Sequence, residues 1–279
     1  FAEMNRAKGP VAQARAMAGL RPDFFKPVIG LERGLTDPIT KLNMGQTAEV
    51  LAHRFGIDRI TADTYADESH HRLAAAQDEG RLKGEVVPVF DTNGRAHEID
   101  DGVRPNSSVE KLGKLNPAFE KPYGKVTPGN SSQITDGASW VILASETAVE
   151  AHGLEPIARI VDSQWAGLDP SIMGLGPVLS STPLAQRHGL SCDDIDLWEI
   201  NEAFAAVVMR AQRDLDIDPA KVNVNGGSIA LGHPLGATGL AQCSELTWQL
   251  RGTADKRQVD DVTAALQHNI GLGGAAVVT

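Results

Sequence analysis

A glycine-rich turn limits most strongly what this chain can fold into. Residues 223–239 read NVNGGSIALGHPLGATG and join a predicted short strand, 222–225, to a predicted helix, 239–250. Glycine allows a close approach of the backbone to a ligand and φ values that other residues rarely adopt. His233 precedes Pro234 on this rigid turn, which fixes its direction. We expect a functional histidine rather than an ordinary packed one, because so many glycines carry an entropic cost.

The turn is not the fingerprint of a dinucleotide site. No Gly-x-Gly-x-x-Gly pattern opens the following helix, and no acidic residue follows at the expected distance.

Strand and helix patterns alternate around the turn, which predicts an α/β layered domain. The predicted strands are 85–90, 157–161, 195–200, 222–225, 262–266 and 275–278. The predicted helices are 44–52, 61–76, 179–187, 205–209 and 239–250. Thr61 and Asp136 are the expected caps of two helices. Residues 91–94 predict a turn, and residues 137–143 predict a strand or a helix.

Composition excludes several classes of protein. Two cysteines in 279 residues cannot form a disulfide framework, and 42% hydrophobic residues argue against a disordered chain. A net charge of −10 without a basic run argues against nucleic-acid binding. No apolar run approaches the ~20 residues of a membrane-spanning helix. We expect no metal site and no permanently bound cofactor, although helix N-termini can still bind an anionic ligand.

Two further polar motifs flank predicted elements. Residues 201–204 read NEAF at a strand-to-helix junction, where an amide and a carboxylate can orient a polar group or simply cap the helix. Residues 130–138 read NSSQITDGA, which alone indicates a polar turn.

Together, the three motifs resemble the thiolase family, enzymes that cleave or form 3-ketoacyl-CoA. The resemblance begins near Thr36 and includes residues 114–119 and 124–138. Residues 104–108 and 121–124 look most like the long-chain thiolase subunit of trifunctional fatty-acid-oxidation complexes. Residues 239–268 instead look like sterol-carrier-type thiolases.

The resemblance implies the thiolase fold, which has two similar α/β/α halves and an inserted loop domain. It assigns residues 1–133 to the loop domain with the CoA-binding surface, and residues 134–155 to the last part of the N-terminal half. Residues 156–279 then form the C-terminal half. We expect the first half to be incomplete, because Phe1 does not look like a natural start.

The resemblance also implies catalytic roles. The family histidine that matches His233 activates a cysteine thiol, and the asparagine that matches Asn201 holds the water of an oxyanion site. A second family cysteine, in a Cys-x-Gly turn, moves the α-proton, but that position is Asn269 here, followed by Ile270 and Gly271. His268 is a candidate substitute. Asparagine can hydrogen-bond but cannot take a proton at neutral pH.

No cysteine stands where this chemistry needs one. Sterol-carrier-type thiolases place a replacement cysteine at the position of Ala203. Cys192 and Cys243 are expected to be packing residues. We therefore expect the acylated cysteine to lie upstream of Phe1.

The CoA-binding residues follow from the same resemblance. Ser132, beside Ser131, matches the serine that contacts the pantetheine arm, and Asn43 and Met44 match the pair that flanks it. Simple core packing is the alternative for Met44.

The predicted function is thiolytic cleavage of 3-ketoacyl-CoA in fatty-acid β-oxidation by an acyl-CoA acyltransferase, with reverse condensation as the other direction. The alternatives are a non-catalytic CoA-binding subunit and a biosynthetic acetoacetyl-CoA thiolase. Ketoacyl synthases fit less well, because they use two histidines in separate motifs.

The expected partners are acyl-CoA, a second copy in a homodimer or tetramer, and a β-oxidation complex. The apolar, proline-broken residues 17–31 indicate either a buried loop or a peripheral membrane or acyl-chain contact. The expected location is the cytoplasm if the source is bacterial.

Overall fold

The computed structural model describes residues 9–18, 21 and 26–279, in two units, Phe1–Thr36 and Asp37–Thr279. The first unit contains helices α2 (Pro10–Ala18) and α3 (Gly30–Gly34). Much of the predicted apolar loop, residues 19–20 and 22–25, lies outside the described residues. Val28 and Ile29 are exposed, which contradicts the buried-loop interpretation for these two residues.

The second unit begins with two helices. Helix α4 (Met44–Arg54) starts with a capping box, in which Asn43 and Gln46 satisfy each other's backbone N–H groups. Helix α5 (Arg59–Asp78) is capped by Asp58, whose carboxylate accepts from the N–H of Thr61 at 2.8 Å. The prediction of Thr61 as the cap was wrong, because Asp58, three residues before Thr61, supplies the acceptor.

A loop-rich stretch follows, as predicted. Strands β1 (Val89–Phe90) and β2 (Ala96–His97) pair antiparallel across the predicted turn, where the N–H of Gly94 donates to the carbonyl of Asp91 at 3.0 Å. The predicted strand 85–90 is reduced to its last two residues. Pro88, which has no N–H to donate, immediately precedes the paired part. Helix α6 (Val109–Gly113) lies within this stretch.

One four-stranded sheet organises the rest, with the order β3-β6-β5-β4. Its strands are β3 (Gln164–Gly167), β4 (Leu197–Ile200), β5 (Ala265–Gly271) and β6 (Ala275–Val278). Strands β4 and β5 are parallel, and the other pairs are antiparallel. The α/β prediction is therefore confirmed.

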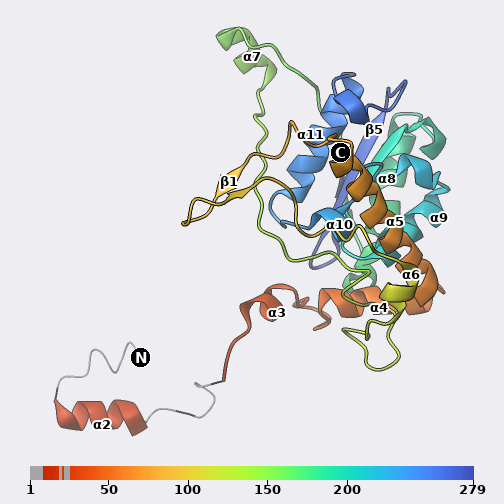
Figure 1. Cartoon of the computed structure of the whole chain (residues 1–279). Helices are drawn as coiled ribbons and strands as arrows, with labels where there is room; N and C mark the ends of the chain where they lie inside the picture. The colour runs from red at the N-terminus through yellow and green to blue at the C-terminus, as the bar shows by residue number, and fades with distance from the viewer. Residues whose placement is uncertain (1–8, 19–20, 22–25) are drawn as a thin grey trace. The chain divides into compact units, whose positions relative to one another are not determined.

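Helices cover both faces of this sheet (Figure 1). Helix α8 (Gly176–Arg187) lies on the face that carries His268, and helix α11 (Thr238–Leu250) lies on the face that carries Asn269. Because side chains alternate along β5, the consecutive residues His268 and Asn269 point to opposite faces of the sheet. Helix α9 (Ala205–Leu215) follows β4 and packs beside α5. The short elements are α7 (Glu146–His152), α10 (Ser228–Leu231) and the 3₁₀ turns Pro170–Leu175, Cys192–Asp194, Pro219–Lys221 and Asp255–Arg257.

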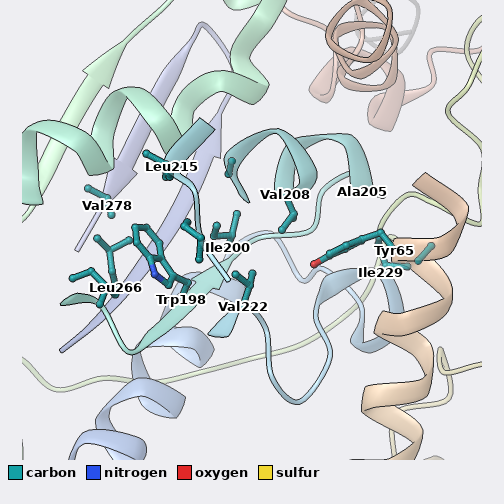
Figure 2. Packing of buried hydrophobic residues seen from close by; sticks show 14 of the residues in the cluster. Tyr65, Trp198, Ile200, Ala205, Val208, Leu215, Val222, Ile229, Leu266 and Val278 are labelled. Carbon is teal, nitrogen blue, oxygen red and sulfur yellow. The ribbon is translucent and has the colours of Figure 1, made fainter. Parts of the chain in front are cut away.

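The main core joins α5 to the sheet. Figure 2 shows Tyr65 extending from α5 toward the cluster around Ile200 and Val222, with Trp198 and Leu266 on the sheet side. All five side chains are buried. Helix α5 is therefore held directly against the end of β4, where residues 201–204 begin.

The described structure lacks the predicted strands 157–161 and 222–225, and it lacks the strand or helix predicted for residues 137–143. Residues 137–143 and 157–161 form neither strand nor helix, and Trp140 and Ile142 are 89% and 93% exposed. No helix starts at Asp136. Residues 222–225 make only a bridge from Val222 to Trp198, because Asn223 adopts a φ of 47°. A strand requires a paired partner, which a local apolar run cannot guarantee.

Strand β5 also begins later than predicted. The N–H groups of Thr263 and Ala264 donate to the carboxylate of Asp196 rather than to a strand. Within the described residues, no helix is long and apolar enough to cross a membrane.

Candidate active site

The candidate site lies where β4 ends and the glycine-rich turn returns. Asn201 is 3% exposed, and its Nδ2 lies 3.2 Å from Nε2 of His233. The hydroxyl of Ser228 donates to Oδ1 of Asn201 at 2.7 Å. This bond fixes the amide, so that its N–H₂ group faces the imidazole. The structure thus brings together two residues that are 32 positions apart in the sequence.

Further hydrogen bonds orient the imidazole of His233. Its Nδ1 lies 2.7 Å from the hydroxyl of Thr238, which itself donates to the carbonyl of Pro234 at 3.2 Å. With that hydroxyl proton engaged, the Thr238 oxygen accepts from Nδ1–H, and Nε2 keeps its lone pair. The backbone N–H of His233 donates to the Thr135 hydroxyl at 3.1 Å and to the carbonyl of Gln133 at 3.3 Å.

The electrostatics of this histidine suit a base. Burial lowers the pKa of His233 below its ordinary value, so the ring is neutral at pH 7. A neutral imidazole with an unprotonated Nε2 can take a proton from a neighbouring thiol.

Two glycines of the turn are required by their surroundings. Gly232 has a φ of 106°, and a Cβ there would overlap the side chain of Thr135. A Cβ on Gly227 would overlap the carboxylate of Glu202. Both residues leave room for groups beside the Asn201–His233 pair.

Glu202 has a position that the sequence did not reveal. It is 1% exposed, and its carboxylate accepts from four donors, which are the hydroxyls of Tyr65 and Ser69, Nδ2 of Asn223 and the N–H of Ile229. Burial and this carboxylate raise the pKa of Tyr65 well above its ordinary value. The one sequence signal was an acidic residue at the junction between a predicted strand and a predicted helix.

Asn269 and Gly271 lie on β5 rather than in a turn, and the turn itself is formed by residues 272–274. Asn269 faces the first turns of α11, where its Nδ2 donates to Oε1 of Gln242 at 2.8 Å. It also lies beside Gly239, the residue after Thr238. Asn269 and His233 therefore contact the same end of α11.

His268 does not join this group. It is 1% exposed, it packs beside Gly176 on the opposite face of the sheet, and neither ring nitrogen has a hydrogen-bond partner. Burial lowers its pKa to about 3. The prediction that His268 could replace the acid–base cysteine is wrong, because its ring can reach neither the site nor solvent.

The predicted CoA residues divide into two groups. Ser131 and Ser132 lie alongside residues 203–204, where the N–H of Ser132 donates to the carbonyl of Ala203 at 3.0 Å. The Ser131 hydroxyl donates to the carbonyl of Thr127 at 2.7 Å, so it is engaged inside the protein.

The other two predicted CoA residues lie at the start of α4. Met44 packs against a buried apolar cluster that includes Phe204, which agrees with the packing alternative. Asn43 caps the helix.

Both cysteines are free and half-buried. Cys192 packs against the main core, as predicted, and burial raises its pKa. Cys243 lies within α11. In the described structure neither thiol is hydrogen-bonded to Asn201 or His233.

Within the described residues, no three His, Cys, Asp or Glu side chains gather as a metal site.

Comparisons with known proteins agree with these motifs. A family model described as "Thiolase, N-terminal domain" matches residues 5–147, and "Thiolase, C-terminal domain" matches residues 154–279. Mitochondrial 3-ketoacyl-CoA thiolase of Rattus norvegicus is 44% identical over 229 residues, which cover 81% of this chain and 57% of the relative. A 3-ketoacyl-CoA thiolase of Marinobacter nauticus is 48% identical over 203 residues, covering 70% and 52%.

Solved structures give the same result. The crystal structure of human mitochondrial 3-ketoacyl-CoA thiolase matches with a TM-score of 0.81 at 40% identity, covering 93% of this chain and 66% of that one. The same human enzyme in complex with CoA matches with a TM-score of 0.80. The chain spans 52% to 57% of the length of the two relatives named above.

Proposed function

The chain belongs to the thiolase family, and we propose that it supplies the base and the oxyanion site of a 3-ketoacyl-CoA thiolase. The reaction is the thiolytic cleavage of a 3-ketoacyl-CoA to acetyl-CoA and a shortened acyl-CoA, as in fatty-acid β-oxidation. The observation that carries the proposal is the 3.2 Å contact between Nδ2 of Asn201 and Nε2 of His233.

In the proposed mechanism, Nε2 of His233 takes the proton of a cysteine thiol. The thiolate attacks the C3 carbonyl carbon of the substrate, the C2–C3 bond breaks, and the enolate of acetyl-CoA leaves with a proton from water. The thiol of a second CoA gives its proton to the hydroxide left by that water and attacks the acyl-enzyme thioester. The enzyme thiolate leaves and takes back the proton held by His233, and the shortened acyl-CoA is released. Asn201, with the protonated His233, stabilises the oxygen that becomes negative in these steps.

We assign the nucleophilic thiol to a cysteine other than Cys192 and Cys243, because neither is bonded to the Asn201–His233 pair. We assign enolate protonation to water, because an amide at Asn269 cannot take or give a proton at neutral pH. His268 is buried on the other face of the sheet.

The proposed CoA site includes Ser132 and the start of α4. The human relative has been solved with CoA bound, which supports acyl-CoA as the ligand here. Residues 104–108 and 121–124 support the long-chain trifunctional type, and residues 239–268 support sterol-carrier features. A homodimer or tetramer, a β-oxidation complex partner, a peripheral membrane contact and a cytoplasmic location in a bacterium remain predictions.

The test is thiolysis by the intact protein of acetoacetyl-CoA and of a long-chain 3-ketoacyl-CoA. Faster cleavage of the long substrate supports the degradative proposal, and cleavage of acetoacetyl-CoA alone supports a biosynthetic thiolase. Asn269 at the family's cysteine position favours one second candidate, a non-catalytic CoA-binding subunit. CoA binding without turnover of either substrate would establish that candidate and reject the enzyme.

A further inference from the structure

We propose that Glu202 is a positioning residue, which holds the glycine-rich turn against α5 and thereby sets the contact between Asn201 and His233. This inference rests on the proposed thiolase function.

The first support is the set of donors around the Glu202 carboxylate. Tyr65 and Ser69 of α5 each donate a hydroxyl at 2.7 Å, while Nδ2 of Asn223 and the N–H of Ile229 each donate at 3.0 Å. Two donors therefore come from α5. The other two, Asn223 and Ile229, come from the part of the glycine-rich turn that precedes His233. One buried carboxylate joins a helix to a turn more than 130 residues away in the sequence.

The second support is the pairing of consecutive residues. Asn201 and Glu202 are neighbours, and so are their partners Ser228 and Ile229. A shift of the turn that broke the Glu202–Ile229 bond would also displace the Ser228 hydroxyl, which orients the Asn201 amide. The amide would then no longer be held toward His233.

The third support is the tight fit of the turn against its neighbours. A Cβ at Gly227 would overlap the Glu202 carboxylate, and a Cβ at Gly226 would lie 2.8 Å from the carbonyl oxygen of Ser69. Arg72 of α5 donates to the carbonyl of Val222 at 2.7 Å. The turn thus contacts α5 closely, and Glu202 lies at the centre of that contact.

The geometry also predicts why glutamine cannot replace Glu202. Each carboxylate oxygen accepts from one hydroxyl and one N–H group: Oε1 from Tyr65 and Asn223, and Oε2 from Ser69 and Ile229. A hydroxyl can turn to accept from the glutamine amide, but an N–H group cannot. In either orientation, Glu202→Gln leaves two N–H donors facing each other.

The experiment compares Glu202→Gln with Glu49→Gln in the intact protein. Glu49 is a matched control, because it is also buried and accepts from two backbone N–H groups, those of Lys125 and Val126, at 2.8 and 2.9 Å. It contacts neither the glycine-rich turn nor Asn201. For Glu202→Gln we expect kcat to fall roughly 10- to 100-fold with KM for the acyl-CoA nearly unchanged. For Glu49→Gln we expect kcat to stay within about twofold of the parent.

A second measurement does not depend on turnover. The pKa of His233 is followed by NMR of ¹⁵N-histidine-labelled protein, with the signal assigned through His233→Gln. Burial lowers this pKa, so a loosened turn should raise it toward the ordinary value in Glu202→Gln but not in Glu49→Gln. An unchanged pKa together with an unchanged kcat overturns the positioning role.

The two readouts separate the two proposals. If the parent protein has no thiolase activity, the proposed function fails, but the shift in the pKa of His233 still tests the role of Glu202. If both glutamine variants lower kcat equally, Glu202 contributes only to stability and the inference is rejected.

Discussion

The two histidines on opposite sides of the β-sheet have opposite environments. His233 lies in the glycine-rich turn at the α11 face, and each ring nitrogen has a partner, Asn201 or Thr238. His268 lies on β5 at the α8 face, and neither of its ring nitrogens has one. Burial lowers the pKa of both. A lowered pKa alone therefore does not identify a catalytic base, whereas oriented hydrogen bonds at an accessible ring do.

Replacement of each histidine tests this contrast most strongly. We expect His233→Ala in the intact protein to lower kcat for thiolysis by roughly 10²- to 10⁴-fold, because the base and part of the oxyanion site are lost. CoA binding, measured by calorimetry, should be nearly unchanged. His268→Leu is the control and should keep kcat within about threefold. Comparable losses in the two variants would reject the contrast.

The pH dependence of stability gives the next largest effect. The pKa of His268 is about 3 in the folded protein and 6.5 ordinarily, so between these values the unfolded chain binds a proton that the folded chain does not. The free energy of unfolding should therefore fall as the pH falls below 6.5, by about 2 kcal/mol between pH 7 and pH 5. Urea unfolding at both pH values measures the loss, and His268→Leu should remove this part of it. An equal loss in the variant would contradict the assignment.

Stability at neutral pH should change less. His268→Leu replaces two unpaired buried nitrogens by apolar atoms of similar volume, on the face of the sheet where His268, Ile270 and Ala276 all lie close to Gly176. We expect the free energy of unfolding at pH 7 to rise by about 1 kcal/mol. A fall of similar size would show that the ring has a partner, such as an ordered water.

The sequence predicted the pairing of Asn201 with His233 better than it predicted the different environments of His233 and His268. Asn201 and His233 stand in short motifs whose order carries the family resemblance, and the structure brings them together. The opposite orientations of His268 and Asn269 follow from a strand, where neighbouring side chains alternate. The family resemblance implied a turn at Asn269, and His268 was the candidate substitute for the cysteine of that turn.

Non-local contacts explain the other differences between the predictions from the sequence and the structure. Glu202 binds Tyr65 and Ser69, whose positions depend on how α5 packs against the sheet. Residues 157–161 have the apolar pattern of a strand but lack a paired strand within the described structure. A local pattern gives the propensity of a segment, whereas pairing and burial are decided by distant parts of the chain.

Replacement of the two cysteines should have the smallest effect. This prediction tests whether His233 is the base for a thiol other than those of Cys192 and Cys243. Cys192 packs against the core with a raised pKa, and Cys243 lies in α11. A nucleophilic cysteine needs a lowered pKa and a neighbouring base. We expect the double variant Cys192→Ala, Cys243→Ala to keep kcat within about twofold and to lose only packing stability. Acyl-enzyme trapped with substrate and located by mass spectrometry should lie on neither residue. Loss of turnover without loss of stability would instead show that Cys192 or Cys243 is the nucleophile. The proposed role of the Asn201–His233 pair in activating a different thiol would then be rejected.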